Sequence, residues 1–327
     1  MKNKLLQIGV VLLVIVLNSC QKDIRETNKT AADVLIKAGN NANVEKSCRL
    51  LVDKGLSDGF IQSYHYNDKG LADEFQLFKP GEYDMWATMA YGERNEITSA
   101  KFYYDAATYY DIIFEYEKDK IVKETWYEPG TNIPFDGYIN SYNTQGQLVK
   151  RDEPIYELYS LFHYDVAHNV TKIEIFDYAG NLYYGVDLTY SRPVKNPFTS
   201  VTGLPESIFF TDAIESPNRF TGLRYYFNDD QGNEVAFVEW KSDETELVAG
   251  AQNYAVYQNS RDDINGIWTD QTWTYENCTG NSEAAHSSHA VSQAKANPFK
   301  QLSHARKTSH YKQDLLAWKK AFLDQNN

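Results

Sequence analysis

The chain has 327 residues, of which 42% are hydrophobic and 24% charged, so it is long enough for one large domain or two small ones and too apolar to be disordered. The 32 basic and 45 acidic residues give a net charge of −13, so we expect no nucleic acid partner. Tyrosine dominates the aromatic residues, with 25 Tyr against 16 Phe, and favours partly exposed strands.

The N-terminus carries a targeting pattern. Met1–Lys4 is a short basic segment, Leu5–Leu17 is an apolar run, and Leu17-Asn18-Ser19-Cys20 follows. The run is shorter than the roughly 20 residues that span a bilayer. The arrangement resembles a bacterial lipoprotein signal, which implies cleavage before Cys20 and acyl chains on that residue. We therefore expect residues 1–19 to be a signal peptide and an acylated Cys20 to anchor the chain stably.

Charged residues follow the cysteine directly. Gln21, Lys22 and Asp23 open a segment that resembles the export tag of surface lipoproteins in the Bacteroidota. The resemblance implies an outer-membrane protein that faces the cell exterior, with retention at the periplasmic face as the alternative. Residues 20–46 are polar with few aromatics, and we expect the lipidated cysteine and a tether there.

Turn sequences recur at a nearly constant interval after Cys48. The last residues of five turns are 25, 25, 26 and 23 positions apart, namely Gly70, Asn95, Lys120, Gly146 and Asn169. Each turn follows a tyrosine, at Tyr66, Tyr91, Tyr116, Tyr142 and Tyr164. Each precedes an aliphatic residue, at Leu71, Ile97, Ile121, Leu148 and Val170. A unit of this length holds two strands and two turns.

The repeats predict a mainly β fold: a large curved antiparallel meander sheet of repeated hairpins over residues 47–278. A sheet of roughly ten to fourteen strands must curl, close or be covered, so a barrel-like form is one expected outcome. Residues 279–327 are predicted to hold a polar linker and then an amphipathic C-terminal helix over Tyr311–Leu323.

Three segments carry a family resemblance. Tyr66–Leu71 and Tyr142–Val149 resemble degenerate tyrosine-aspartate (YD) repeats. Tyr190–Phe198 is similar to a segment of Bacteroidota lipoproteins of unknown function with a porin-like β fold. The resemblance implies a curved, meander-type β sheet and no particular reaction.

Two cysteines remain besides Cys20. Cys48 opens the first predicted strand and Cys278 ends the last, so a closing sheet could bring them together as a disulfide in an oxidising compartment. Two buried free thiols are the alternative, and the sequence alone does not set the distance between them.

Several short motifs have a turn or linker explanation. Gly55-Leu56-Ser57-Asp58-Gly59 fits a hydrolase elbow, but a strand-like run follows where a helix is required. His286-Ser287-Ser288-His289 lies in a Ser/Ala-rich linker without metal-ligand spacing. Asp229-Asp230 and Asp262-Asp263 read as turn residues rather than as calcium ligands or paired catalytic carboxylates. We therefore expect no cofactor, no metal and no catalytic residue.

Trp268, Trp273 and Tyr275 form the densest aromatic run. Surface aromatics can stack on sugars or on partner proteins, but the odd separation of the two tryptophans places them on opposite faces of a strand. The favoured function is a non-enzymatic surface binding or scaffold protein that is attached to the membrane by its lipid and contacts a glycan or an envelope protein. The alternative is a glycan hydrolase that uses acidic residues.

Overall fold

The computed structural model describes residues 48–56, 59–79, 83–103, 109–203, 216–229, 231–242 and 247–278. The chain divides into Met1–Glu45 and Lys46–Asn327, and all of the described residues belong to the second unit. Cys20 to Asp23, the histidine pair at 286 and 289 and the predicted C-terminal helix therefore lie outside the described residues. No helix within the described ranges is long and apolar enough to span a membrane.

The described residues form seventeen strands and two short 3₁₀ helices. The first nine strands are β1 (Arg49–Gly55), β2 (Ile61–Tyr66), β3 (Ala72–Lys79), β4 (Tyr83–Tyr91), β5 (Ile97–Tyr103), β6 (Tyr109–Glu117), β7 (Lys120–Tyr127), β8 (Pro134–Tyr142) and β9 (Leu148–Glu153). The others are β10 (Leu158–Tyr164), β11 (Val170–Asp177), β12 (Leu182–Thr189), β13 (Gly222–Asn228), β14 (Glu234–Lys241), β15 (Leu247–Ala249), β16 (Ala255–Asp262) and β17 (Ile267–Glu276). The 3₁₀ helices are η2 (Pro197–Ser200) and η4 (Ala251–Asn253).

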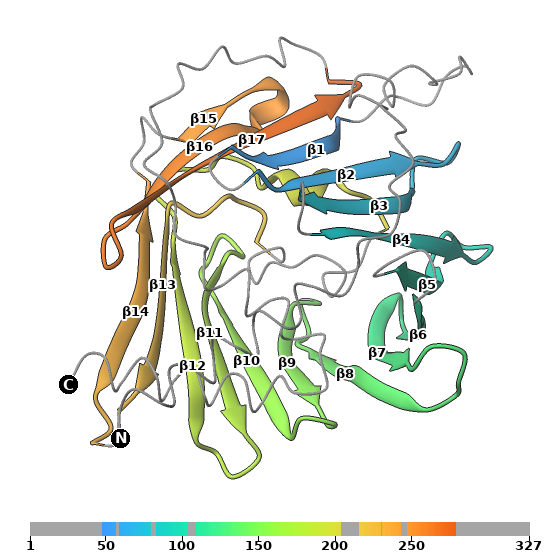
Figure 1. Ribbon diagram of the computed structural model, residues 1–327, viewed down its shortest axis with the longest axis horizontal. Helices are drawn as coiled ribbons and strands as arrows, with labels where there is room; N and C mark the ends of the chain where they lie inside the picture. The colour runs from blue at the N-terminus through green and yellow to red at the C-terminus, as the bar shows by residue number, and fades with distance from the viewer. Residues whose placement is uncertain are drawn as a thin grey trace, which may run out of the picture. The chain divides into compact units, whose positions relative to one another are not determined.

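The strands form one antiparallel sheet that closes on itself. From β1 to β14 each strand pairs with the next, and β14 pairs with β16, β16 with β17, and β17 with β1. Short β15 pairs with β16, so sixteen strands make the ring. In Figure 1 the blue first strand and the orange last strand lie side by side. The predicted antiparallel meander is confirmed, with more strands than we expected.

The two faces of the sheet differ in chemistry. One face packs into two apolar clusters, the first from β1–β7 and β15–β17 and the second from β9–β14. Phe75, Phe102 and Ile112 on that face are 0% exposed. On the other face Glu74, Lys101 and Glu115 are exposed, as alternation along a strand requires. The apolar face is therefore the inner, protein-covered side, and the polar face is the outer one.

The connection between β12 and β13 packs against the inner face. Val194, Phe198 and Val201 join the first apolar cluster. The Asn196 side chain accepts a hydrogen bond from the Phe198 amide and so caps η2. Ser200 Oγ accepts a bond of 3.0 Å from the Leu50 amide, which ties this connection to β1.

The hairpin turns contain a residue with positive φ near their ends, a conformation that Gly and Asn tolerate best. Gly70, Asn95 and Gly146, the last residues of three turns, have φ of 79°, 66° and 79°. In the other two turns the positive φ lies one residue earlier, at Asp119 and His168, both with φ of 66°. Asp and His, like Asn, adopt positive φ more often than other non-glycine residues, so glycine is not required.

The tyrosine before each turn bonds to the preceding repeat. The hydroxyl groups of five tyrosines each donate a hydrogen bond to a main-chain carbonyl that lies at the start of a strand. The pairs are Tyr66 with Leu50, Tyr91 with Ala72, Tyr142 with Ile121, Tyr164 with Leu148 and Tyr190 with Val170. Tyr116 has a main-chain hydrogen bond with Ile97 in the corresponding place. Three of the five carbonyls belong to the aliphatic residues that follow the turns in the repeat.

The register of the strands explains why these hydroxyls are needed. Where two repeats meet, the last paired residue lies two positions from the residue that accepts the tyrosine bond. For example, the pairing of β7 with β8 ends at Lys123↔Ile139, and Ile121 lies two positions before Lys123. The same break occurs at the other five junctions. A carbonyl that loses its strand partner must find another donor, and the tyrosine hydroxyl supplies it. The 25-residue rhythm thus corresponds to one hairpin and one tyrosine bond per repeat.

Candidate functional site

Cys48 and Cys278 lie just outside the paired ends of β1 and β17. Their Cα atoms are 4.4 Å apart and their side chains form a disulfide across 230 positions of sequence. The register Arg49↔Glu276 brings the two ends together, because β1 and β17 are neighbours in the ring. Cys48 is buried in the first apolar cluster, which indicates a structural role for this disulfide.

The aromatic run near the end of the sheet does not form one surface. Trp273 is 2% exposed and Tyr275 is buried, and both belong to the inner cluster. Trp268 is 39% exposed on the opposite face, where the Arg261 guanidinium lies 5.8 Å from its ring centre. The predicted division of the two tryptophans between faces is confirmed, and a shared ligand platform in this run is not formed.

The acidic pairs have turn geometry. Asp262 accepts hydrogen bonds from the Ile264 and Asn265 amides, and Asp229 accepts them from the Gln231 and Asn233 amides. These bonds lower the pKa of Asp229. No group of three or more metal-binding side chains occurs among the residues that the structure describes.

The glycines of the apparent hydrolase elbow also belong to a turn. Gly55 ends β1, Gly59 has φ of 69°, and β2 begins at Ile61. The Gly55 amide donates a hydrogen bond of 2.8 Å to the Phe60 carbonyl. A strand follows where the elbow requires a helix, as we expected.

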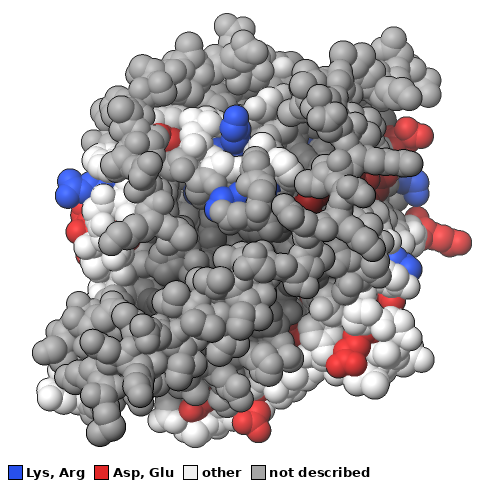
Figure 2. All heavy atoms as spheres, in the orientation of Figure 1, with Lys and Arg blue, Asp and Glu red and all other residues white. Residues whose placement is uncertain are grey.

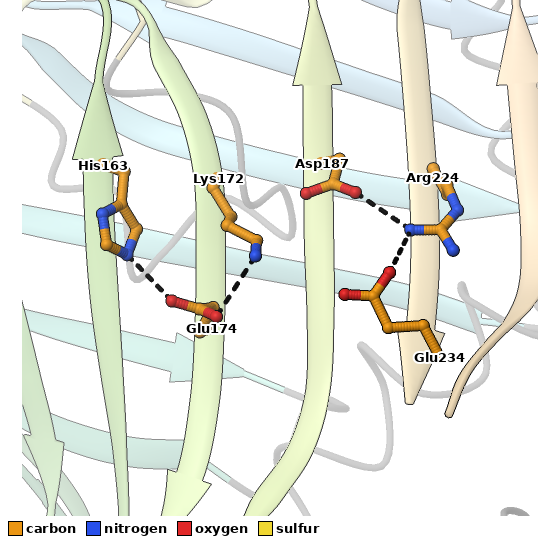
Figure 3. A network of polar contacts seen from close by, with 6 residues as sticks. All are labelled: His163, Lys172, Glu174, Asp187, Arg224 and Glu234. Carbon is orange, nitrogen blue, oxygen red and sulfur yellow. Dashed lines mark hydrogen bonds and ion pairs between the residues drawn. The ribbon is translucent and has the colours of Figure 1, made fainter. Parts of the chain in front are cut away.

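An ionic network crosses the outer face of β10 to β14. Its members are His163, Lys172, Glu174, Asp187, Arg224 and Glu234 (Figure 3). Glu174 bridges His163 at 2.9 Å and Lys172 at 3.3 Å. Arg224 Nη1 lies 3.1 Å from both Asp187 and Glu234. The strand register places Lys172 opposite Asp187, and Asp187 opposite Arg224, so neighbouring strands present opposite charges.

One tyrosine fills the centre of this network. The Tyr226 ring lies over Gly185 on the neighbouring strand, where an added Cβ would meet the ring at 2.2 Å. Lys172 and Arg224 stand over the same ring at 5.5 and 4.8 Å from its centre. The cations are therefore satisfied by carboxylates and by the ring, and the network has little net charge left to attract an ionic ligand.

Other strands of the outer face are also joined by ion pairs. Ion pairs join Lys101 to Asp111 and Lys123 to Glu115 across adjacent strands. Figure 2 shows basic and acidic groups close to one another at the left and right margins of the molecule. Exposed pairs of this kind contribute about 0.2–1 kcal/mol each, so their main effect is a well-hydrated surface.

One row on the outer face is aromatic instead. Trp86, Tyr103 and Tyr109 lie opposite one another on β4, β5 and β6, and all three are partly exposed. The Trp86 and Tyr103 rings stack with centroids 4.8 Å apart and planes at 8°, and Tyr103 and Tyr109 are 5.5 Å apart. We call these three residues the aromatic row.

Polar pairs flank the aromatic row. Gln76, opposite Trp86 on β3, donates a hydrogen bond of 2.9 Å to Asp84. Beside Tyr103 and Tyr109 on β5 and β6, Lys101 pairs with Asp111 and stands 4.4 Å from the centre of the Tyr109 ring. No local sequence pattern indicates this row, because its members are far apart in sequence and meet only through the strand register.

The inner face also carries polar groups, and these have structural partners. Glu124 accepts a hydrogen bond from Trp126 Nε1. Arg219, in the connection between β12 and β13, donates to Gln258 at 2.7 Å and to Gln271 at 3.0 Å. Burial lowers the pKa of Arg219 to about 10, and the charge of Asp53 opposes that shift. These contacts fasten the connection to β16 and β17.

No protein-family model matches the sequence, and no curated protein resembles it as a relative. Among solved structures, the chain is similar to a porin-like protein from Bacteroides uniformis, with 14% identity, coverage of 69% of this chain and 95% of the other, and a TM-score of 0.43. A porin-like protein from Bacteroides vulgatus shares 8% identity over 70% of this chain and 99% of its own, with a TM-score of 0.35. The Photorhabdus luminescens Tc holotoxin pore shares 11% identity over 69% of this chain and 15% of its own, with a TM-score of 0.24.

Proposed function

We propose that this protein is a lipid-anchored binding or scaffold protein of the outer membrane without catalytic activity, and that it faces the cell exterior. The observation that carries the proposal is the sidedness of the sheet. The large apolar clusters are buried inside, with Phe75, Leu77 and Phe102 at 0% exposure, whereas the outer face carries ion pairs and polar groups among scattered apolar side chains such as Ile113 and Trp268.

This sidedness is the reverse of that of a sheet embedded in lipid. A lipid-facing wall carries an apolar band, and a Lys or Arg at its midplane costs about 2–4 kcal/mol. Lys101 and Lys123 lie on adjacent parts of the outer face with side chains 47% and 46% exposed. A sheet of this kind is suited to water, so membrane attachment has to come from another part of the chain.

The N-terminal sequence offers that attachment. Cleavage before Cys20 and acylation of its thiol and amine would place two or more acyl chains at the start of the mature protein. Each buried methylene contributes about 0.8 kcal/mol, so such an anchor holds stably. Gln21, Lys22 and Asp23 would then form the signal for display on the outer surface.

Metabolic labelling with radioactive palmitate tests the anchor. The wild-type protein should take up label and fractionate with the outer membrane, whereas Cys20→Ala should do neither. Cys278→Ser is the matched control, because it also removes one cysteine but should keep the label. Label on the Cys20→Ala variant, or no label on the wild type, would contradict the proposal.

Protease treatment of intact cells tests the orientation. A protein displayed outward should be cleaved at the rate of known surface proteins, and replacement of Lys22 and Asp23 by alanine should protect it without loss of palmitate. A labelled wild-type protein that stays protected would place it at the periplasmic face instead.

A further inference from the structure

We infer that the C-terminal segment Tyr311–Leu323 of the same chain docks on an apolar patch of the outer face, at one end of β8 to β12. The inference goes beyond the proposed function and does not depend on the lipid anchor. It starts from exposed or partly exposed apolar side chains that adjoin one another on neighbouring strands and turns. These residues, which we call the outer apolar patch, are Ile139, Ile155, Tyr159, Phe176, Tyr178 and Leu182.

The strand register makes most of the patch continuous across the outer face. Tyr159 lies opposite Phe176, and Phe176 lies opposite Leu182 on the next strand. The Tyr159 and Phe176 rings are in contact, with centroids 5.3 Å apart. Ile139 joins the same row, because it lies opposite Asp152 and Asp152 lies opposite Tyr159. The row thus crosses the neighbouring strands β8 to β12 (Figure 1).

Two turn residues extend the patch beyond the ends of the strands. Ile155 lies in the turn between β9 and β10, and Tyr178 follows β11. The Tyr178 amide donates a hydrogen bond of 2.9 Å to the Glu157 carbonyl, so the two turns are neighbours. Ile139, Ile155 and Tyr178 are 44%, 47% and 53% exposed. Their side chains therefore keep apolar surface that a docked segment removes from water.

The patch has an acidic border. Glu157 lies in the same turn as Ile155, Asp177 precedes Tyr178, and Asp152 lies 2.7 Å from Lys150. Burial raises the pKa of the Tyr178 hydroxyl, and the charges of Asp152 and Glu157 add to this rise while Lys150 opposes it. The three carboxylates and one ammonium sum to −2, so the patch favours a cationic occupant.

The C-terminal segment has the opposite charge. Tyr311–Leu323 contains three lysines and one aspartate, which sum to +2. The same contrast holds for the longer parts of the chain, because residues 48–278 hold 18 basic and 38 acidic residues, whereas residues 279–327 hold 7 basic and 3 acidic ones. A second copy of the sheet would bring two strongly acidic surfaces together. Charge therefore selects the chain's own basic segment as the occupant.

The apolar residues of the segment match the patch in kind. Tyr311, Leu315, Trp318 and Phe322 follow the spacing of one face of the helix that the sequence predicts. Such a face needs an apolar surface to cover it. The lysines of the segment lie outside this stripe, so their long side chains reach the acidic border while the apolar residues contact the patch.

The length of the chain permits the contact. The disulfide fixes Cys278 beside the paired ends of β1 and β17. In the ring, β12 lies four strand spacings from β17, which is about 20 Å, and the length of β12 adds about 27 Å. A flexible chain of the length of residues 279–310 has a root-mean-square span of about 30 Å and extends to about 100 Å. Attachment to the same molecule also gives the segment a high effective concentration at the patch.

Carbodiimide cross-linking of the purified full-length lipoprotein in phosphatidylcholine nanodiscs tests the inference. This reagent joins a lysine amine to a carboxylate that it contacts, and mass spectrometry identifies the joined residues. Lys312, Lys319 or Lys320 should be joined to Glu157 or Asp177. In a mixture of nitrogen-15-labelled and unlabelled protein, the links should join residues of one chain only.

Variants of the segment and of the patch provide matched controls. Trp318→Asp should lower the yield of these links at least threefold, whereas Gln313→Asp, which adds the same charge on the opposite helix face, should keep most of it. Ile155→Ser should also lower the yield, whereas Ile264→Ser should not, because Ile264 is 42% exposed in a different turn. Far-ultraviolet circular dichroism of each variant establishes that the fold is retained.

Three results would overturn the inference. The first is the absence of any link between the segment and the carboxylates of the patch. The second is an equal loss of links in the two variants of either matched pair. The third is a set of links that join labelled to unlabelled chains, which would assign the patch to a second copy. Palmitate labelling and cleavage on intact cells are independent of all three, so the proposed function is tested separately.

Discussion

At the scale of single residues, the repeated tyrosines explain both the rhythm of the sequence and the cohesion of the sheet. Each hydroxyl replaces a strand partner that the register removes. Burial raises the pKa of four of these side chains, Tyr66, Tyr91, Tyr116 and Tyr190, and to about 12 for the last two, because the ionised form would lose its water. Neutral tyrosine is therefore a structural requirement of the fold.

Removal of one tyrosine hydroxyl should cost more stability where the carbonyl that it bonds has no second donor. Tyr66→Phe should lower the free energy of unfolding by about 1 kcal/mol, because the Leu50 carbonyl loses its bond of 2.7 Å. Tyr142→Phe should cost less, since Asn140 Nδ2 also donates to the Ile121 carbonyl at 3.0 Å. Urea denaturation of both variants measures the difference, and equal losses would contradict this assignment.

Because burial raises the pKa of these tyrosines, we expect the protein to lose stability in alkali. Below pH 10 tyrosine is protonated in both the folded and the unfolded chain, so stability is unaffected. Between pH 10 and about 12 the unfolded chain ionises first, and the free energy of unfolding falls. Denaturation at several pH values should show this fall, and a Tyr116→Phe, Tyr190→Phe double variant should show a shallower one. A stability that is flat up to pH 12 would argue against buried hydroxyls.

At the scale of strands and hairpins, position in the register decides what each side chain does. Gly185 shows this, since its missing side chain makes room for the Tyr226 ring from the neighbouring strand. That ring is 1% exposed although it lies on the outer face, because it lies flat over the glycine beneath Lys172 and Arg224.

Filling that space should displace the ring. Gly185→Ala is expected to lower the free energy of unfolding by about 1–3 kcal/mol through overpacking. The added penalty should shrink in a Tyr226→Ala background, which a double-mutant cycle detects. Gly92→Ala is the control, because there the added Cβ meets only the movable Glu96 carboxylate. Additive effects of Gly185→Ala and Tyr226→Ala would contradict the contact.

The hairpins could be predicted from sequence because their signals are local. A tyrosine, an Asn or Asp that accepts amide bonds within the turn, and a residue with positive φ lie within about six positions of one another, as at Tyr66–Leu71. The aromatic row could not be predicted, since Trp86 and Tyr103 meet only when the register of β4 and β5 is known. Conversely, Trp268 and Trp273 are close in sequence yet lie on opposite faces.

At the scale of the whole sheet, closure of the ring depends on some strand junctions that have only two or three residue pairs. β14 meets β16 through only Trp240↔Asp262 and Lys241↔Arg261, and β1 meets β2 through three residue pairs. The first and last strands, in contrast, pair over most of their length and carry the Cys48–Cys278 bond beside them. The covalent bond reinforces the one junction that joins the two ends of the meander.

Loss of this bond should destabilise the sheet as a whole. A cross-link over 230 positions lowers the entropy of the unfolded chain, by an amount worth up to about 5 kcal/mol. Cys48→Ser, Cys278→Ser and the double variant should therefore unfold at lower urea concentration and to the same extent as one another. Unchanged midpoints, or two titratable thiols in the unfolded wild-type protein without reductant, would show that the bond does not form.

Because both ends of the meander are fastened to each other, a single proteolytic nick in any connection between β1 and β17 would not release a fragment. The pieces would remain one covalent body and would separate on a gel only after reduction. Damage at one exposed turn would thus leave the remaining hairpins in place.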